Sequence, residues 1–307
     1  MSSVVSRKPN VKWNDVAGLN RAKDELQRAI VFPMRFPSLF DDKRKSSSAV
    51  LLYGPPGTGK SYLAKALATE VHCSLYNISS EDLMSKWLGD SKKLVRHLFW
   101  LARENKPSII FIDDIDVFCA NRDGDSEHRN EHTAHIKTEL LIQLDGVKND
   151  NTGVVVLAAT SSPWLLDPAV RRRFDLRIYI LLPDSEARIF LFRIHSGKWG
   201  QSLSESDLAE LAKLTDDFRE ILSGSEQGMY EIYSPHELGA MQLTWVEIPN
   251  DNPKAPSIEL ADFIRVLGDG EAKSSIGCNE PEKYADWTRS FGIDGNTTTS
   301  NMAAGVN

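Results

Sequence analysis

The sequence predicts an α/β protein, with a five-stranded parallel sheet between helices followed by a smaller helical domain. Short apolar runs, each long enough for one strand buried on both faces, recur with room for a helix between them. A glycine-rich loop follows the first run, and a helical pattern takes over after Pro183. Alternation of strand and helix is typical of a parallel sheet that is covered on both sides.

The expected elements follow one another along most of the chain. Apolar residues recur at helical spacing from Asn20 until Pro33 stops the pattern, which indicates a first amphipathic helix. Farther on, Ser204 and Asp207 offer a capping box for a helix, and residues 258–267 suggest another. The five expected strands are Val50 to Tyr53, Leu75 to Ile78, Ile109 to Ile112, Val154 to Ala159 and Arg177 to Leu181.

These elements suggest four divisions of the chain. We expect an N-terminal tail over residues 1–12 and a large α/β domain over residues 13–183. A small helical domain with a C-terminal helix would occupy residues 184–293. Residues 294–307 are polar and rich in small side chains, so we expect a disordered tail there.

Composition narrows the classes of function. The formal net charge of -7, from 36 basic and 43 acidic residues, argues against nucleic-acid binding through bulk charge. The three cysteines are far apart and do not have the spacing of a disulfide framework or a zinc site. No apolar run is long enough to span a membrane. We therefore expect a cytoplasmic protein that reaches membranes only through partners.

The glycine-rich loop has the pattern of a phosphate-binding loop. Its glycines can adopt positive φ and let backbone N–H groups converge on a triphosphate. The lysine would place an ammonium against the β and γ phosphates, and the serine would bind Mg²⁺ at the start of a helix. A glycine turn with a coincidental lysine is the weaker interpretation. The expected ATP contacts are Gly54, Pro55, Pro56, Gly57, Thr58, Gly59, Lys60 and Ser61.

Two carboxylates follow a buried strand. Asp113 and Asp114 come directly after the apolar run that ends at Ile112, where the carboxyl end of a parallel strand would lie beside the phosphate loop. Asp113 is the natural Mg²⁺ ligand, and Asp114 would orient or deprotonate the attacking water. The alternative interpretation is that the two aspartates only begin a turn. The phosphate loop makes this alternative the weaker one.

Five segments together resemble the AAA ATPases of the meiotic clade, which includes katanin, spastin, fidgetin and the vacuolar protein-sorting ATPase that disassembles ESCRT-III. They cover most of residues 11–215. Within the clade, residues 234–245 and 287–292 look like the vacuolar-sorting branch. The five segments are Trp13 to Leu19, Gly54 to Ser61, Ser85 to Gly89, Lys106 to Asp113 and Asp167 to Phe174.

The resemblance implies a homo-oligomeric ring, usually a hexamer, with ATP and Mg²⁺ between subunits. Its substrates would be ESCRT-III-like polypeptides, and the protein would associate peripherally with endosomal membranes. Two of Arg171, Arg172 and Arg173 would reach a neighbour's γ-phosphate, and Arg172 with Arg173 is the favoured pair. Without the family, three consecutive arginines more often form a solvated or ion-paired surface.

The resemblance also assigns three further sets of residues. Ala17 and Gly18 would contact the nucleotide, and Ser161 would sense its γ-phosphate. Lys86, Trp87 and Leu88 would form a pore loop that grips an extended polypeptide. Read alone, a tryptophan at this position is more often a buried core residue.

Several positions depart from the family pattern. The family has glutamate at Asp114 and asparagine at Ser161, and an arginine pair at Ala134 and His135. A block of small-domain core expected after Thr215 is missing, so the helical domain should be truncated. The family's N-terminal three-helix module that binds ESCRT-III tails is also expected to be missing.

These departures leave three functions open. The first is a ring-forming ATPase, with full or reduced activity, that remodels protein complexes. The second is an ATP-binding, hydrolysis-impaired regulatory paralogue, which Asp114 and Ser161 favour. The third is a microtubule-severing ATPase, which the acidic balance makes less attractive.

Overall fold

The computed structural model describes residues 5–7, 9–36, 48–79, 90–120, 127–145, 152–196, 203–215, 260–268 and 281–295. Contacts divide the chain into two compact units. The first comprises Met1–Leu182 together with Glu280–Asn307, and the second comprises Pro183–Asn279. Among the described residues, no helix is long and apolar enough to cross a bilayer.

The first unit is built on a sheet that has seven strands in the part of the chain described. Only the β1–β3 pair is antiparallel, and all other neighbours are parallel. The five predicted strands form its centre and are confirmed; the edge strands β1 and β7 are too short to show a periodicity. In spatial order the strands are β1 (Val5–Arg7), β3 (Ser74–Ile78), β4 (Ser108–Ile112), β5 (Val154–Thr160), β2 (Ala49–Tyr53), β6 (Leu176–Tyr179) and β7 (Ile293–Asp294).

The central strands are apolar along their whole length because helices cover both faces of the sheet. Every residue of β2, β4 and β5 is buried. In register, Tyr53 of β2 pairs with Thr160 of β5, and Ile112 of β4 pairs with Ala158 of β5. The carboxyl ends of these three strands therefore lie at the same edge of the sheet.

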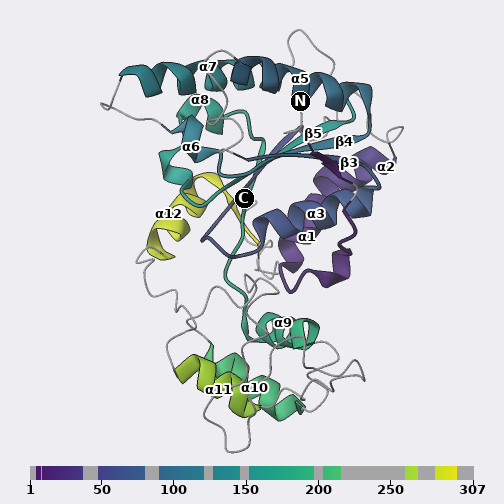
Figure 1. Cartoon of the computed structure of the whole chain (residues 1–307), viewed down its shortest axis with the longest axis vertical. Helices are drawn as coiled ribbons and strands as arrows, with labels where there is room; N and C mark the ends of the chain where they lie inside the picture. Colours follow the sequence, from purple (N-terminus) through teal and green to yellow (C-terminus); the bar gives the residue numbers. More distant parts are fainter. Residues whose placement is uncertain are drawn as a thin grey trace, which may run out of the picture. The chain divides into compact units, whose positions relative to one another are not determined.

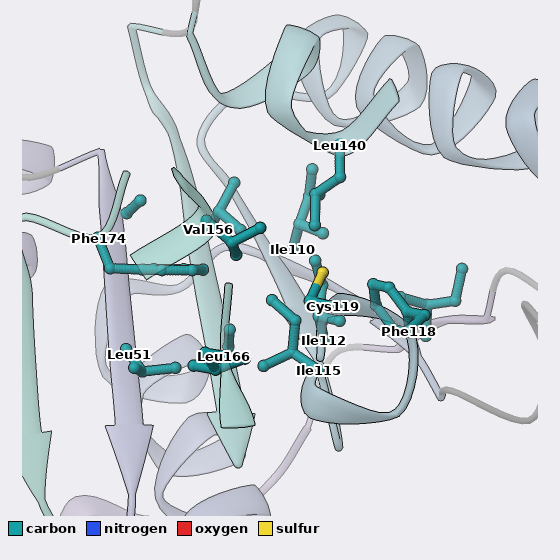
Figure 2. Close-up of a cluster of buried hydrophobic side chains, with 14 of the residues drawn as sticks. Leu51, Ile110, Ile112, Ile115, Phe118, Cys119, Leu140, Val156, Leu166 and Phe174 are labelled. Carbon is teal, nitrogen blue, oxygen red and sulfur yellow. The ribbon is translucent and has the colours of Figure 1, made fainter. Parts of the chain in front are cut away.

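Helices α5 (Asp90–Glu104) and α7 (Glu127–Leu144) cover one face, and α1 (Asn20–Leu26) and α3 (Lys60–Val71) cover the other (Figure 1). Successive residues of a strand point to opposite faces. Leu51 accordingly packs with Ile110, Val156 and Leu140 on the α7 side (Figure 2), whereas Val50 and Leu52 join the core on the α3 side.

The first helical region passes the proline at which the sequence pattern was expected to stop. After α1, a π-helical segment η2 (Gln27–Val31) continues into α2 (Phe32–Arg35), with Pro33 near its start. Pro33 has no N–H to donate and its ring crowds the preceding turn, and the π-helical hydrogen-bond register lies directly before it in the chain. The remaining short helices of this unit are η1 (Trp13–Asp15), α6 (Asp116–Cys119), η4 (Pro163–Leu165) and α8 (Pro168–Arg171).

Helix α12 (Pro281–Phe291) groups with the first unit, although its position in the sequence led us to expect it in the small domain. Its Trp287 is buried and meets Tyr53 edge to face, with ring centroids 4.4 Å apart. The Tyr53 hydroxyl also donates to Thr288 Oγ1 at 2.8 Å. The large aromatic area buried against the end of β2 explains this grouping.

The chain after α12 is also built into the first unit as far as Gly295. Residues Ile293–Asp294 form β7, and the backbone N–H of Gly295 donates to the carbonyl of Tyr179 at 3.0 Å. A Cβ atom on Gly292 would lie only 1.9 Å from the Tyr53 hydroxyl. Asp294, expected at the start of a disordered tail, is therefore a strand residue, and residues 296–307 lie outside the described part.

The second unit contains α9 (Ser185–Ser196), α10 (Glu205–Leu214) and α11 (Leu260–Gly268) among its described residues. The predicted capping box is confirmed, since Ser204 and Asp207 exchange hydrogen bonds between side chain and backbone. Phe192 packs edge to face with Phe263 in its core. The missing block expected after Thr215 falls on residues outside the described ranges.

Candidate nucleotide-binding site

The loop of residues 54–61 connects the carboxyl end of β2 to the first turn of α3. Gly57 and Gly59 have φ of 76° and 86°, which only glycine adopts without strain. A Cβ atom on Gly54 would lie 2.1 Å from the carbonyl oxygen of Ile180. The glycines therefore allow a tight turn that directs the N-terminus of a 12-residue helix at the loop, an arrangement that binds phosphates.

Lys60 is enclosed by this loop. Its ammonium donates to the carbonyl oxygens of Gly54 at 2.9 Å and Pro55 at 2.7 Å, and the residue is only 8% exposed. Burial lowers the pKa of the Lys60 ammonium to about 8, although the carboxylates of Asp113 and Asp114 act in the opposite direction. Phosphate oxygens would compete with the two carbonyls for this charge.

Ser61 and Asp113 meet at the mouth of the loop. The Ser61 hydroxyl donates to Asp113 Oδ2 at 2.7 Å, across 52 residues of sequence. Asp113 follows β4, and its backbone N–H is held by the carbonyl of Ile78 at 3.2 Å. A hydroxyl and a carboxylate that converge beside a phosphate loop are the oxygen ligands that Mg²⁺ takes, so the residues present fit this ion.

Asp114 lies beside Asp113 but has an unusual backbone. Its φ is 48°, in the left-handed region that aspartate tolerates better than most residues. Its backbone N–H donates to Asp113 Oδ1 at 3.2 Å, and the residue is exposed. The carboxylate therefore projects from a tight turn at the carboxyl edge of the sheet, next to the Ser61–Asp113 pair.

Ser161 follows β5 at the same edge. The preceding carbonyl, of Thr160, accepts from the backbone N–H of Gly54 at 3.2 Å, which ties this turn to the phosphate loop. The Thr160 hydroxyl donates to Asp116 Oδ1 at 2.5 Å, and the backbone N–H of Ser162 donates to the Thr160 hydroxyl at 3.0 Å. The structure thus brings Lys60, Ser61, Asp113, Asp114 and Ser161 to one edge of the sheet.

Two residues that the sequence reasoning missed contact this edge. Asp116 fixes the turn through Thr160, and its place two residues after Asp114 in the same acidic motif was a usable signal. The Tyr284 hydroxyl donates to the carbonyl oxygen of Ser161 across 123 residues. No local pattern in the sequence indicates that contact.

The three arginines at the end of α8 and directly after it have different environments. The guanidinium of Arg171 lies 4.0 Å from the ring centroid of Phe291, and Arg173 forms an ion pair with Asp145 at 2.6 Å. The Arg172 side chain is exposed. In the described part of the chain, no hydrogen bond joins these arginines to residues 54–61 of the same subunit.

The turn at Ala17 and Gly18 lies before α1. Gly18 has φ of 55°, and Lys23 donates from its ammonium to the carbonyl of Val16 at 2.6 Å. Helix η1, just before the turn, packs against α3. The turn therefore lies on the same side of the sheet as α3, which is the helix that follows the phosphate loop.

Lys86, Trp87 and Leu88 lie outside the described residues. Ala134 and His135, where the family pattern has arginines, are exposed on α7.

The fold and this edge together define a nucleotide-binding protein of the phosphate-loop class. The model of the ATPase family associated with various cellular activities (AAA) matches residues 50–182, and that of the Vps4 C terminal oligomerisation domain matches residues 233–292. The chain belongs to the AAA ATPase family and carries the C-terminal domain of its Vps4 branch. Most of residues 233–292 lie outside the described ranges, apart from α11 and α12.

Curated relatives agree with this assignment. Vacuolar protein sorting-associated protein 4B of Mus musculus is 43% identical over 95% of this chain and 72% of its own length. Vacuolar protein sorting-associated protein 4A of Homo sapiens is 41% identical over 95% and 74%. Katanin p60 ATPase-containing subunit A1 of Arabidopsis thaliana is 38% identical over 94% and 56%, so the predicted preference for the vacuolar-sorting branch is confirmed.

A solved structure gives the same fold. The FIGL-1 AAA domain in complex with ADP has a TM-score of 0.75 and 31% sequence identity, and the match covers 95% of this chain and 94% of that one. The α/β class expected from the sequence is thereby confirmed at the level of the whole fold.

Proposed function

We propose that this chain is a Mg²⁺-dependent ATPase that works as a homo-oligomeric ring and disassembles ESCRT-III-like polymers. The observation that carries the proposal is the Ser61–Asp113 hydrogen bond of 2.7 Å beside the enclosed Lys60. These three groups come from two segments 52 residues apart and meet where a triphosphate would end. Their convergence supports phosphate chemistry more strongly than any one motif.

Each residue has a role that its position supports. Ser61 and Asp113 would hold Mg²⁺, which neutralises charge on the β and γ phosphates. Lys60 would leave its two carbonyl partners and contact the phosphates. Asp114 would orient the attacking water, and the Ser161 hydroxyl would contact the γ-phosphate. Ala17 and Gly18 would complete the nucleotide site.

The ring is supported by the oligomerisation domain matched at residues 233–292. In such a ring the exposed Arg172 is free to reach a neighbour's nucleotide, whereas Arg173 is already paired with Asp145 inside its own subunit. We therefore assign the main trans-acting role to Arg172 and a supporting one to Arg173. Lys86, Trp87 and Leu88 would grip the polypeptide in the pore.

The substrate class follows from the relatives. Proteins at 41% to 43% identity are named for vacuolar protein sorting, which supports a role on ESCRT-III-like polypeptides at endosomal membranes. The net charge of -7 fits a protein that reaches an anionic membrane through partners rather than by its own charge. Microtubule severing remains the third candidate because katanin is also a relative.

A hydrolysis-impaired regulatory subunit is the second candidate. It is favoured by Asp114, whose side chain is one methylene shorter than the family's glutamate and whose φ is 48°. Displacing a catalytic group by about 1 Å can reduce the rate about a hundredfold. At the position that would sense the γ-phosphate, Ser161 carries only a hydroxyl, which weakens the contact with that phosphate. This departure also favours impaired hydrolysis.

ATP turnover measured over a range of protein concentrations tests the leading proposal. We expect the rate per subunit to rise with concentration and with Mg²⁺ as the ring assembles, and Lys60→Ala to remove it. The same preparations are incubated with ESCRT-III filaments and with microtubules, and released subunits are measured by sedimentation. A rate equal to that of Lys60→Ala at assembling concentrations contradicts ATP hydrolysis, and release from microtubules alone contradicts the substrate class.

A further inference from the structure

The turn after β5 is held from two sides. From within the α/β core, Asp116 accepts from the Thr160 hydroxyl, which in turn accepts from the backbone N–H of Ser162. From outside, the Tyr284 hydroxyl of α12 donates to the carbonyl of Ser161. Consecutive residues 160–162 are thus fixed by groups from α6 and from α12, which are far apart in the sequence.

Tyr284 is itself rigidly placed. The residue is 3% exposed. Its ring stacks on Tyr179 with centroids 5.5 Å apart and meets Trp164 edge to face at 5.0 Å. Lys283 adds a cation–π contact to the same Trp164 ring at 4.0 Å. Since aromatic packing fixes the ring, the direction of its hydroxyl is determined before any hydrogen bond forms.

Packing alone does not require this hydroxyl. A phenylalanine would keep the same stacked and edge-to-face contacts, and Trp287, one turn along α12, already anchors the helix against Tyr53. What the hydroxyl adds is a bond to the backbone of Ser161, a residue whose side chain would touch the γ-phosphate. A serine side chain is short, so its reach depends closely on where its backbone lies.

We propose that Tyr284 is a positioning residue for ATP hydrolysis, which acts by holding the Ser161 backbone so that the serine hydroxyl faces the γ-phosphate. The inference rests on the proposed ATPase function and extends it to the C-terminal helix. It links α12, at the end of the segment matched as an oligomerisation domain, to the hydrolysis edge of the same subunit. Any change that moves α12 would change the rate.

The test compares Tyr284→Phe with Thr288→Val in the full chain. Thr288→Val removes another hydrogen bond between α12 and the sheet, the one from Tyr53, together with the bond from the Thr288 hydroxyl to the Tyr284 carbonyl, and it does not touch Ser161. We expect both variants to lose similar stability on thermal unfolding. Tyr284→Phe should lower kcat about three- to tenfold and raise the KM for ATP, because one hydrogen bond that positions the γ-phosphate contact is lost, while Thr288→Val keeps both values.

A double substitution shows whether Tyr284 acts through Ser161. In a Ser161→Ala background the hydroxyl to be positioned is gone, so Tyr284→Phe should cause no further loss of kcat. Equal losses of kcat in Tyr284→Phe and Thr288→Val, or an undiminished loss in the Ser161→Ala background, would overturn the proposal and leave a structural role only.

A binding measurement separates this inference from the ATPase proposal. The ratio of ATP to ADP affinity, measured by competition with a fluorescent nucleotide, reports on the γ-phosphate contact without turnover. We expect Tyr284→Phe and Ser161→Ala to lower this ratio equally, and Thr288→Val to keep it. Absence of turnover in the unmodified protein would refute the ATPase alone, whereas an unchanged ratio in Tyr284→Phe would refute the positioning role.

Discussion

At the scale of single residues, the nucleotide site depends on a lysine charge kept away from water. Lys60 is 8% exposed, and its pKa is lowered to about 8 because burial disfavours the ammonium. The nearby aspartates act in the opposite direction, and with a pKa of about 8 the ammonium stays mostly protonated at neutral pH. The charge is therefore available to phosphates under physiological conditions but is titratable a little above them.

Nucleotide affinity should therefore fall as the pH rises. Phosphates bind the protonated form of Lys60. Above a pH of about 8 the side chain is mostly deprotonated in the free protein, so nucleotide binding must also take up a proton and the affinity falls. For a pKa of about 8, the affinity for ADP should drop about tenfold between pH 7 and pH 9. Titration with a fluorescent nucleotide at constant ionic strength measures it, and Lys60→Ala should bind weakly with no such slope. A flat profile in the unmodified protein would contradict the assignment.

Asp114 is the second residue considered at this scale, and its identity should determine the rate of ATP hydrolysis. We expect Asp114→Glu to raise kcat for ATP by about tenfold or more, since the longer side chain brings the carboxylate nearer the attacking water. The KM for ATP should stay unchanged, because the phosphate contacts are made by other residues. Steady-state kinetics at saturating Mg²⁺ measures both. Brisk hydrolysis by the unmodified protein with no gain on substitution would exclude the regulatory alternative.

At the scale of elements, a buried carboxylate joins the two helices that cover one face of the sheet. Glu139 of α7 is nearly inaccessible and accepts from Arg96 of α5 at 2.9 Å and 3.2 Å, and from Gln143 at 2.9 Å. The hydrogen bonds from Arg96 lower the pKa of Glu139, which keeps it ionised. The pair fixes the spacing of α5 and α7 over the core shown in Figure 2.

Replacing this carboxylate should loosen the helical layer. Glu139→Gln removes the charge from the hydrogen bonds with Arg96, and we expect the free energy of unfolding to fall by about 1–2 kcal/mol. Because the pKa of Glu139 is lowered on folding, its contribution is present above the ordinary glutamate pKa and is lost as the pH falls through the lower folded value. Urea unfolding at pH 7 and at acid pH measures the difference. Glu104→Gln, at an exposed position of α5, is the control and should have no effect.

At the scale of the whole molecule, the proposed ring would complete the site of one subunit with an arginine from a neighbour. Lys60, Ser61 and Asp113 come together within the chain, whereas Arg172 is exposed and makes no hydrogen bond to residues 54–61 in the described part of the chain. Arg173 is restrained by its 2.6 Å ion pair with Asp145. Hydrolysis should therefore depend on assembly rather than on the single chain.

Mixing two inactive variants tests this dependence. Lys60→Ala and Arg172→Ala should each be inactive alone, with the loss in Arg172→Ala about a thousandfold in kcat at unchanged nucleotide affinity. In a mixture, a subunit with an intact Lys60 can lie beside one with an intact Arg172, so part of the ATPase activity should return. Mixtures that stay inactive while sizing shows mixed oligomers would contradict a trans-acting Arg172. Arg173→Ala, which frees Asp145, should retain more activity than Arg172→Ala.

The sequence by itself determined the features that depend on neighbouring residues. The phosphate loop from Gly54 to Ser61, the five central strands and the capping box at Ser204 all follow from local conformational preferences and from a period of two or of 3.6 residues. Asp113 could also be placed, because the carboxyl ends of parallel strands share one edge of a sheet.

The tertiary structure alone decided what depends on packing between distant segments. It groups α12 with the α/β unit, because Trp287 and Tyr284 bury their rings against side chains from the carboxyl edge of the sheet. It encloses Lys60 enough to change its pKa, and it pairs Arg173 with Asp145 while leaving Arg172 exposed. Periodicity carries no information about contacts across 123 residues, such as that of Tyr284 with Ser161, since these arise only when the chain has closed on itself.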